Sequence, residues 1–305
     1  MLSLLSVLQI EAQKTIDLSG DWNFEIDRQD IGEKEKWFNQ TLQDVIELPG
    51  SMPERLKGDD VTVRTRWTGS LYDSSYYYNP YMEKYRREGN VKLPFFLTPD
   101  KHYVGVAWYQ KEINLPKDWK KERIVLVLER PHIESTVWVN GHKVGMQNSL
   151  CVAHIYDVTR YVRPGKCNIT IRIDNRIKEI NVGPDSHSIT DQTQGNWNGI
   201  VGRICLQATP HVYFDDIQVF PEPEQKLARV KLRIKSSNKS STTAQVRLSA
   251  ESFNAEKKHI LPVLMQEVKV KHGIAEQEIV LPMGDDMLLW DEFNPALYKL
   301  TAEIS

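Results

Sequence analysis

Two stretches of the chain carry side chains of the kinds that recognise sugars. The first runs from Arg66 to Arg87 and crowds tryptophan and tyrosine among Gly, Ser, Asn and Pro, with few aliphatic residues. Aromatic faces stack on the C–H faces of sugar rings, while indole and phenol groups hydrogen-bond hydroxyls. Long irregular segments of this kind inside a compact domain are usually functional or else disordered, and the aromatic content argues against disorder. Trp67, Tyr76 and, further along, Tyr103 are therefore candidate carbohydrate-binding residues.

The second stretch runs from Arg176 to Trp197 and is rich in Asn, Asp, Ser, Thr and Gln. Its end reads T-D-Q-T-Q-G-N-W-N-G and places hydrogen-bond donors and acceptors beside an indole, as recognition of a carbohydrate requires. The candidate carbohydrate-binding residues here are Asp191, Gln194, Asn196, Trp197 and Asn198.

Both stretches also have a plainer interpretation. A loop that packs its own rings into a satellite cluster has the same aromatic content as a loop that faces a ligand. A loop that makes only turns and caps has the same content of Asn, Asp, Ser and Thr. The sequence leaves these alternatives open.

Other chemistries leave no matching pattern. Asp185-Ser186-His187 holds the residue types of a nucleophilic triad, but adjacent residues do not make that geometry, and no G-x-S-x-G elbow exists. Cys151, Cys167 and Cys205 stand far apart without a C-x-x-C pair, so we predict no metal site. We expect the cysteines to be small buried side chains, with one disulfide among them left open. No phosphate-cradling glycine loop is present, and we predict no cofactor.

Charge and hydropathy narrow the class of partner. The 305 residues include 39 basic and 41 acidic side chains, for a net charge of −2. Without a basic stripe, nucleic acid is not an expected partner.

No stretch reaches the roughly 18 apolar residues that a membrane span needs. Residues 1–12, M-L-S-L-L-S-V-L-Q-I-E-A, are typical of a clipped signal-peptide remnant, which predicts a periplasmic or secreted protein; a plain apolar first strand is the alternative.

The elements that must position these loops are β-strands. Thr136 to Gln147 alternates valine with Trp138 and then places Asn140-Gly141, which favours a tight hairpin. The β-branched run Arg123 to Glu129 leads into it. Asn168 to Asp174 follows with strict alternation and three isoleucines on one face. The pattern predicts an all-β protein with a sandwich of antiparallel strands at its centre.

The length predicts two domains. Pro221-Glu222-Pro223-Glu224 resists both helix and central strand, so we place the boundary there and assign residues 13–220 to the first domain, with His211 to Phe220 as its last strand. Residues 221–305 show the regular strand spacing of a small β-sandwich. Its predicted strands are Arg229 to Ser236, Thr243 to Glu251, Gln266 to Val270, Gln277 to Leu281 and Tyr298 to Ile304.

Eight short motifs give the chain a family resemblance. They include Leu18 to Phe24, Leu48-Pro49-Gly50, Ala107-Trp108-Tyr109, Val137 to Gly141, Asp157-Val158-Thr159, Asp174-Asn175, Asn196 to Ile200 with Arg203, and Asn294-Pro295 with Leu297-Tyr298. In this order, and covering nearly the whole chain, they resemble the non-catalytic N-terminal part of family 2 glycoside hydrolases, the β-galactosidase, β-glucuronidase and β-mannosidase group. Any one motif alone would be a weak signal.

The resemblance implies a galactose-binding-like jelly-roll sandwich over residues 13–220 and an immunoglobulin-like β-sandwich over residues 221–305. A (β/α)8 barrel that holds the chemistry would follow. Retaining glycosidases use two carboxylates about 5 Å apart, and in this family both are barrel glutamates. Because the chain stops at Ser305, we assign it no catalytic residue and expect it to be inactive alone. In some relatives an acid just before the last jelly-roll tryptophan reaches over the active site; Gly195 and Asn196 stand there, and Asp191 is the nearest acid.

Three functions follow from this reading. The first is an accessory region of a family 2 glycoside hydrolase, with a carbohydrate and the missing catalytic barrel as partners. A stand-alone lectin-like module and a purely structural pair of sandwiches are the alternatives. In the family one more strand follows the N-P-x-L-Y-x-L motif. We therefore expect the second sandwich to be incomplete, to be the less stable domain and to self-associate through its open edge.

Overall fold

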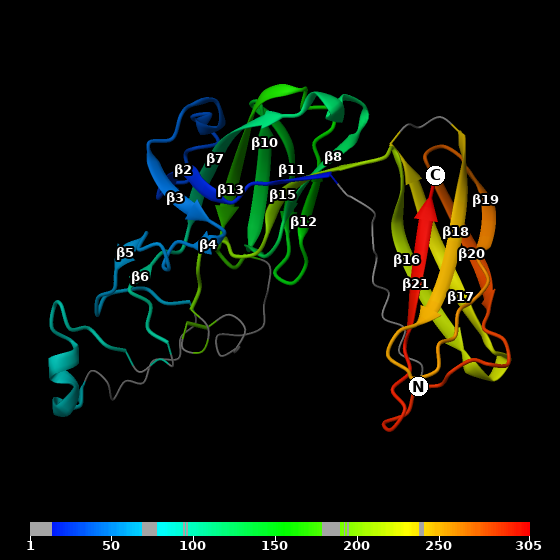
Figure 1. The fold of residues 1–305 in the computed structure, drawn as a ribbon. Helices are drawn as coiled ribbons and strands as arrows, with labels where there is room; N and C mark the ends of the chain where they lie inside the picture. The colour runs from blue at the N-terminus through cyan, green and yellow to red at the C-terminus, as the bar shows by residue number, and fades with distance from the viewer. Residues whose placement is uncertain are drawn as a thin grey trace. The chain divides into compact units, whose positions relative to one another are not determined.

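A computed structural model of the chain describes residues 14–68, 78–93, 95, 97–178, 190–191, 193, 195–237 and 241–305. The predicted signal-peptide remnant lies outside these ranges. The described chain is nearly all β-structure and divides into two compact units, residues 15–208 and residues 209–305 (Figure 1). This confirms the predicted all-β class with two sandwiches.

The first unit is a sandwich of two sheets (Figure 1). Their strand orders are β1-β15-β8-β12 and β11-β10-β13-β7-β2-β3, as in a jelly roll. The strands are β1 Lys14–Asp17, β2 Gly20–Asp27, β3 Asp44–Leu48, β7 Val106–Leu115, β8 Arg123–Leu128, β10 Glu134–Val139, β11 His142–Asn148, β12 His154–Asp157, β13 Gly165–Asp174 and β15 Ile204–Thr209. The 3-10 helices η1 Trp37–Asn39 and η3 Lys117–Lys121 lie between them.

Alternating side chains from both sheets meet in one core. Trp22 and Phe24 on β2 and the three isoleucines of β13 face Leu126 and Leu128 on β8, and all are at most 1% exposed. Burying an apolar side chain of this size stabilises the fold by about 1.5–3 kcal/mol. Every second side chain of these strands therefore points into the core, as expected for a sandwich whose sheets each bury one face.

The predicted hairpin is confirmed. Val139 faces His142 across the β10–β11 turn, and Asn140 and Gly141 have φ of 49° and 79°, the left-handed values that a two-residue primed turn requires. The Asn140 side chain accepts a hydrogen bond from the Asn168 backbone N–H (2.9 Å) and donates one to the Tyr161 carbonyl (3.0 Å). The Asn140 side chain thus also anchors the turn to the segments that contain Asn168 and Tyr161.

Strand β13 is buried on both faces. On the face opposite the isoleucines, Thr170, Arg172 and Asp174 are at most 7% exposed. The segment between β2 and β3 covers this face, and its Trp37 and Phe38 pack against the buried indoles of β7 and β10. Trp138, which is 2% exposed, stacks on Phe38 with the ring planes 5° apart, so this indole is part of the packed interior.

Short strands close the end of the sandwich where β2 and β13 finish. β4 Gly50–Ser51, β14 Gly199–Ile200 and β9 Pro131–His132 form a small sheet in that order. Gly199 has a φ of 142°, and a Cβ there would collide with the Gly50 carbonyl, so only glycine fits. β5 Asp59–Asp60 pairs with β6 Lys101–His102 across a long insertion that contains the 3-10 helix η2, Pro80–Tyr85.

The second unit is a sandwich of two three-stranded sheets, β16-β17-β20 and β19-β18-β21. Its core gathers Val230, Leu232, Val246, Leu248 and Leu281, which are at most 2% exposed. All five strands predicted beyond residue 221 are confirmed. The elements are β16 Val212–Glu222, η4 Pro223–Gln225, β17 Leu227–Ser236, β18 Thr242–Ser252, β19 Leu264–Val270, β20 Ile274–Pro282 and β21 Tyr298–Ile304.

The predicted domain boundary at Pro221 is wrong. β16 pairs with β17 from Val212 to Glu222, so the strand that we assigned to the first domain belongs to the second. The units divide near residue 209. Pro221 and Glu222 are the last two residues of β16, and η4, which begins at Pro223, forms the connection to β17. Pro221 fits in β16 because this strand lies at the edge of its sheet, and Pro223 fits in the turn, so the composition of a domain linker also suits a strand end and its turn.

The cysteines are free thiols. Cys167 and Cys205 are buried, as predicted, and burial raises the pKa of the Cys167 thiol to about 11. Cys151 is exposed, so the prediction of a buried side chain is wrong at that position. It lies in the loop between β11 and β12.

Candidate functional site

An open pocket of about 770 Å³ lies where β2 and β13 end and β7 begins. Strand β7 runs antiparallel to both neighbours, so the three strands bring Arg28, Tyr103 and Arg176 to the same edge of the sheet. The insertion adds residues 62–68 with Trp67 at their end, and β6 adds His102. Two of the predicted carbohydrate-binding residues, Trp67 and Tyr103, thus line one pocket.

Trp67 is half-buried between two rings. Its ring centroid lies 4.9 Å from that of Phe95, edge-on at 85°, and 4.6 Å from that of His102. The indole Nε1 and the His102 Nδ1 are both buried, and neither has a hydrogen-bond partner among the described residues. Because buried ring nitrogens normally find a hydrogen-bond partner, this pair is an uncommon feature of the pocket wall.

Tyr103 contributes its aromatic ring to the pocket wall, whereas its hydroxyl is used inside the protein. The phenol donates a hydrogen bond to the Val106 carbonyl at 2.9 Å, and the Arg28 guanidinium lies 5.6 Å from the ring centroid. Burial raises the pKa of Tyr103 to about 12, so the group stays protonated at neutral pH. Its polar atom is therefore already engaged inside the fold.

Asp191 fastens the Trp67 loop to the loop that precedes β14. Its carboxylate accepts hydrogen bonds from the backbone N–H groups of Thr68 and Asn196, the latter at 2.6 Å. The Asp191 N–H donates to the Thr68 carbonyl at 3.1 Å. The Asn196 side chain adds a 3.0 Å hydrogen bond to the Thr68 hydroxyl. Three of these four hydrogen bonds are made by Thr68, the residue next to Trp67.

Two further asparagines extend this network to the ends of β7 and β13. Asn175 accepts from the Gly105 N–H at 2.8 Å and donates to the Tyr103 carbonyl at 2.8 Å and to Asn196 Oδ1 at 3.1 Å. Asn198 donates to the carbonyls of Gly105 and Ile173, both at 3.1 Å, and accepts from the Tyr109 hydroxyl at 2.7 Å. Each amide therefore satisfies backbone groups that packing has removed from water.

These contacts set the roles of the predicted site residues. Asp191, Asn196 and Asn198 are at most 5% exposed, and their polar atoms are engaged by the protein, so they position the loops and do not face the pocket. Tyr76 and Gln194 lie outside the described residues. Trp67 and Tyr103 are the predicted residues that the pocket brings together.

Trp197 lies on a separate surface. Its half-buried ring stacks on His132 with centroids 4.5 Å apart, and His132 Nδ1 is 2.7 Å from the Trp197 carbonyl oxygen. Burial lowers the pKa of His132, although the hydrogen bond to this carbonyl opposes the effect. The imidazole is therefore neutral at neutral pH and donates from Nδ1. The pair is a second aromatic surface, on the β4-β14-β9 sheet.

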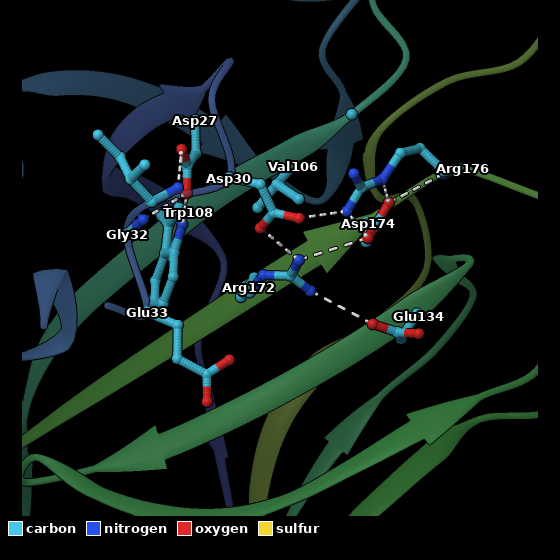
Figure 2. A network of polar contacts seen from close by, with 12 residues as sticks. Asp27, Asp30, Gly32, Glu33, Val106, Trp108, Glu134, Arg172, Asp174 and Arg176 are labelled. Atoms are coloured by element: carbon cyan, nitrogen blue, oxygen red, sulfur yellow. Dashed lines mark hydrogen bonds and ion pairs between the residues drawn. The ribbon is translucent and has the colours of Figure 1, made fainter. Parts of the chain in front are cut away.

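A network of ion pairs supports the pocket from behind, on the buried outer face of β13. Figure 2 shows Arg172 and Arg176 converging on Asp30 and Asp174, with Glu134 on the far side of Arg172. Arg176 contacts both aspartates at 2.6 Å, and Arg172 contacts Asp30 at 2.8 Å. Burial acts to raise the pKa of Asp174, but hydrogen bonds from Arg176 and Lys178 outweigh it and hold that pKa well below its usual range.

Sequence reasoning missed the arginines of the pocket. Arg28, Arg64, Arg66 and Arg176 all line it. The run T-V-R-T-R-W, which places two arginines directly before Trp67, was the signal that could have pointed to them. Arg28 and Arg176 come from distant segments and carry no local signal, since only the pairing of β2, β7 and β13 brings them together.

No group of three or more His, Cys, Asp or Glu side chains among the described residues is arranged to hold a metal ion. No helix in those ranges is long and apolar enough to cross a membrane.

Comparison with known proteins places both units. Residues 15–210 match the family model for the sugar-binding domain of glycosyl hydrolases family 2, and residues 212–305 match a second model of the same family. The boundary between the two matches agrees with the division near residue 209. The chain is 25% identical over 218 residues to a β-glucuronidase of Paenibacillus borealis, covering 67% of this chain and 30% of that protein.

Other relatives are similarly distant. The chain is 28% identical over 162 residues to the β-glucuronidase of Homo sapiens, covering 45% of this chain and 25% of the relative. It is 24% identical to the β-galactosidase large subunit of Leuconostoc lactis, and the match covers 88% of this chain and 39% of the relative. A solved β-glucuronidase of an uncultured Clostridium species shares the fold, with a TM-score of 0.60 at 20% identity over 100% of this chain and 45% of that one. The chain thus spans between a quarter and a half of these proteins' lengths.

The ion-pair network predicts acid-sensitive stability. The pKa of Asp174 is depressed in the folded state, so its stabilising contribution is present above the unfolded pKa of about 4 and is lost as the pH falls. At pH 7, Asp174→Asn should lower the free energy of unfolding by about 3 kcal/mol, because it removes one partner of a buried pair. The variant should also lose part of the wild-type decline in stability between about pH 5 and pH 2.

Urea unfolding measured across this pH range tests both statements. Asp285→Asn is the matched control, because Asp285 pairs with Lys226 at a position where its side chain is 94% exposed. Such surface pairs contribute at most about 1 kcal/mol. If Asp174→Asn behaves like Asp285→Asn at pH 7, the network does not stabilise the first unit.

Proposed function

Because the chain belongs to glycosyl hydrolases family 2, we propose that it is the N-terminal accessory region of a β-galactosidase-like or β-glucuronidase-like enzyme and that its first unit binds carbohydrate. The pocket containing Trp67 is the observation that carries this proposal. A half-buried indole, an aromatic wall at Tyr103 and an open volume of about 770 Å³ offer a surface on which a sugar ring can stack. The loops that form the pocket are held by the Asp191 and Asn175 hydrogen bonds, so this surface is preorganised.

We assign the hydrolytic step to another part of the enzyme. The relatives are two to four times longer than the segments they share with this chain, and the described residues form two β-sandwiches. A retaining glycosidase needs two facing carboxylates, whereas the buried carboxylates of the first unit are engaged by arginines or by backbone N–H groups. A catalytic barrel is the partner that the family resemblance implies.

A lectin-like module that binds sugar without any catalytic partner is the second candidate. The second aromatic surface, at Trp197 and His132, favours it, since two separate sugar-stacking surfaces suit an extended glycan. Substitutions at the two surfaces therefore tell them apart in a binding experiment.

Binding should depend on Trp67. In calorimetric titration with β-linked oligosaccharides, Trp67→Ala should weaken binding about tenfold, the equivalent of about 1.4 kcal/mol for a lost stacking surface. Tyr161→Ala, a half-buried ring in the turn after β12, is the matched control and should bind like the wild type. If Trp197→Ala abolishes binding while Trp67→Ala leaves it unchanged, the site is the β14 surface and not the pocket.

The 305 residues alone should not hydrolyse glycosides. Incubated with nitrophenyl β-galactoside, β-glucuronide and β-mannoside, they should release nitrophenol no faster than the uncatalysed reaction. Turnover that a single carboxylate substitution within this chain abolishes would show that the chemistry resides here.

We also propose that the second unit associates with a copy of itself along β21. This strand pairs with β18 on one side, and no described strand covers its other side. Gln245 and Ser305 exchange backbone hydrogen bonds of 2.9 and 3.1 Å, so the odd-numbered residues of β21 face β18. The even-numbered residues therefore direct their N–H and C=O groups to the open edge.

Sedimentation velocity over a hundredfold concentration range tests the association. The wild type should shift from monomer to dimer as its concentration rises, whereas Ala302→Pro should stay monomeric, since it removes an N–H from the open edge and leaves the β18 ladder intact. A wild type that stays monomeric throughout contradicts the proposal.

A further inference from the structure

The pocket carries more positive than negative charge. Four arginines and two carboxylates line it, the latter being Asp59 and Asp60. Charges of opposite sign that pair with each other cancel locally, so what a ligand meets depends on which groups remain unpaired.

Most of these charges are already neutralised by protein partners. Arg28 pairs with Asp59 at 2.7 Å, and Lys101 pairs with Asp60 at 2.5 Å. Arg176 is held by the two aspartates of the network behind the pocket. Both carboxylates that line the pocket, and two of its four arginines, are therefore already in ion pairs with other protein groups.

Arg64 and Arg66 are different. In the part of the chain that the structure describes, neither guanidinium makes an ion pair or a hydrogen bond. Only their backbone groups are engaged, the Arg64 N–H by the Thr62 hydroxyl and the Arg66 carbonyl by His102. The turn from Thr62 to Thr65 and the Asp191 contacts at Thr68 fix the backbone on both sides of them. Among the described residues these two cations thus have no acidic partner, and they stand on a held segment next to Trp67.

This arrangement matches an anionic sugar better than a neutral one. A guanidinium presents parallel N–H donors that match the two oxygens of a carboxylate, or two oxygens of a sulfate, in a charge-assisted pair. The neighbouring indole offers an apolar face to the ring that carries the anion. A neutral sugar could use the indole but would leave both arginines without a partner.

We propose that the pocket binds a sugar that carries an oxyanion, with Arg64 and Arg66 pairing to a uronate carboxylate or a sulfate ester while the ring stacks on Trp67. This inference rests on the proposed function, since it specifies which carbohydrate the pocket takes. Arg64 and Arg66 are specificity-determining residues in this scheme.

Three methyl glycosides that differ only at C6 test the proposal: the neutral hexose, its uronic acid and its 6-sulfate. Titrated against the full chain in dilute buffer, at least one acidic form should bind about tenfold more tightly than the neutral form. The difference should shrink in 0.5 M NaCl, because salt screens charges near the surface. Which acidic form binds identifies the source of the oxyanion.

Variants connect this preference to the two arginines. Arg64→Gln with Arg66→Gln should reduce the preference for the acidic form to less than twofold. Arg160→Gln removes an exposed arginine outside the pocket and should leave the preference intact. Circular dichroism and thermal unfolding check that the double variant is folded, and Arg64→Lys with Arg66→Lys, which keeps the charge, should retain part of the preference.

The other outcomes are distinguishable. If all three glycosides bind equally and Trp67→Ala abolishes binding, the pocket binds carbohydrate as proposed but the charge preference is overturned. If none binds, the proposed function fails and this inference fails with it. If inorganic sulfate alone competes as strongly as the acidic glycosides, the arginines form a general anion site, and the assignment to an anionic sugar is overturned.

Discussion

The requirement that buried backbone groups keep a hydrogen-bond partner governs the pocket end of this molecule. The loops around Thr68, Gly105, Asn175 and Asn196 fold onto the sandwich and lose water, so their N–H and C=O groups need partners inside the protein. Strand pairing cannot supply them, because the loops are irregular. Short side chains with donors and acceptors in fixed geometry supply them instead, at Asp191, Asn175 and Asn198. The pocket is the space that remains between loops held in this way.

A related constraint acts on the outer face of the six-stranded sheet. β13 is covered on both sides, so Arg172 and Asp174 are removed from water and persist as charges only because they pair with each other, with Asp30 and with Arg176 (Figure 2). Arg176 belongs to this network and also lines the pocket. The charge that a ligand would meet is thus set partly by ion pairs behind the pocket wall. Arg64 and Arg66 are then the pocket arginines whose side chains have no partner among the described residues.

Much of the fold followed from local sequence, and most of the site did not. The hairpin at Asn140-Gly141 and the strands of the second unit could be predicted because turn chemistry and a period of two are properties of neighbouring residues. The boundary at Pro221 was misplaced because a proline-rich turn inside a domain and a linker have the same composition. Asp191 and Asn198 were grouped with Trp67 on residue type alone, whereas burial, which depends on the tertiary fold, separates a positioning side chain from a binding one.

The indole N–H signals of a 15N-labelled sample, followed during titration with an oligosaccharide, give the most direct view of the pocket. Trp67 lines the pocket, while Trp138 lies under Phe38 and Trp197 lies against His132, so the three signals report three separate places. If the pocket binds sugar, the Trp67 signal shifts in a saturable way, and the Trp138 and Trp197 signals stay in place. A saturable shift at Trp197 with none at Trp67 would contradict the assignment of the pocket.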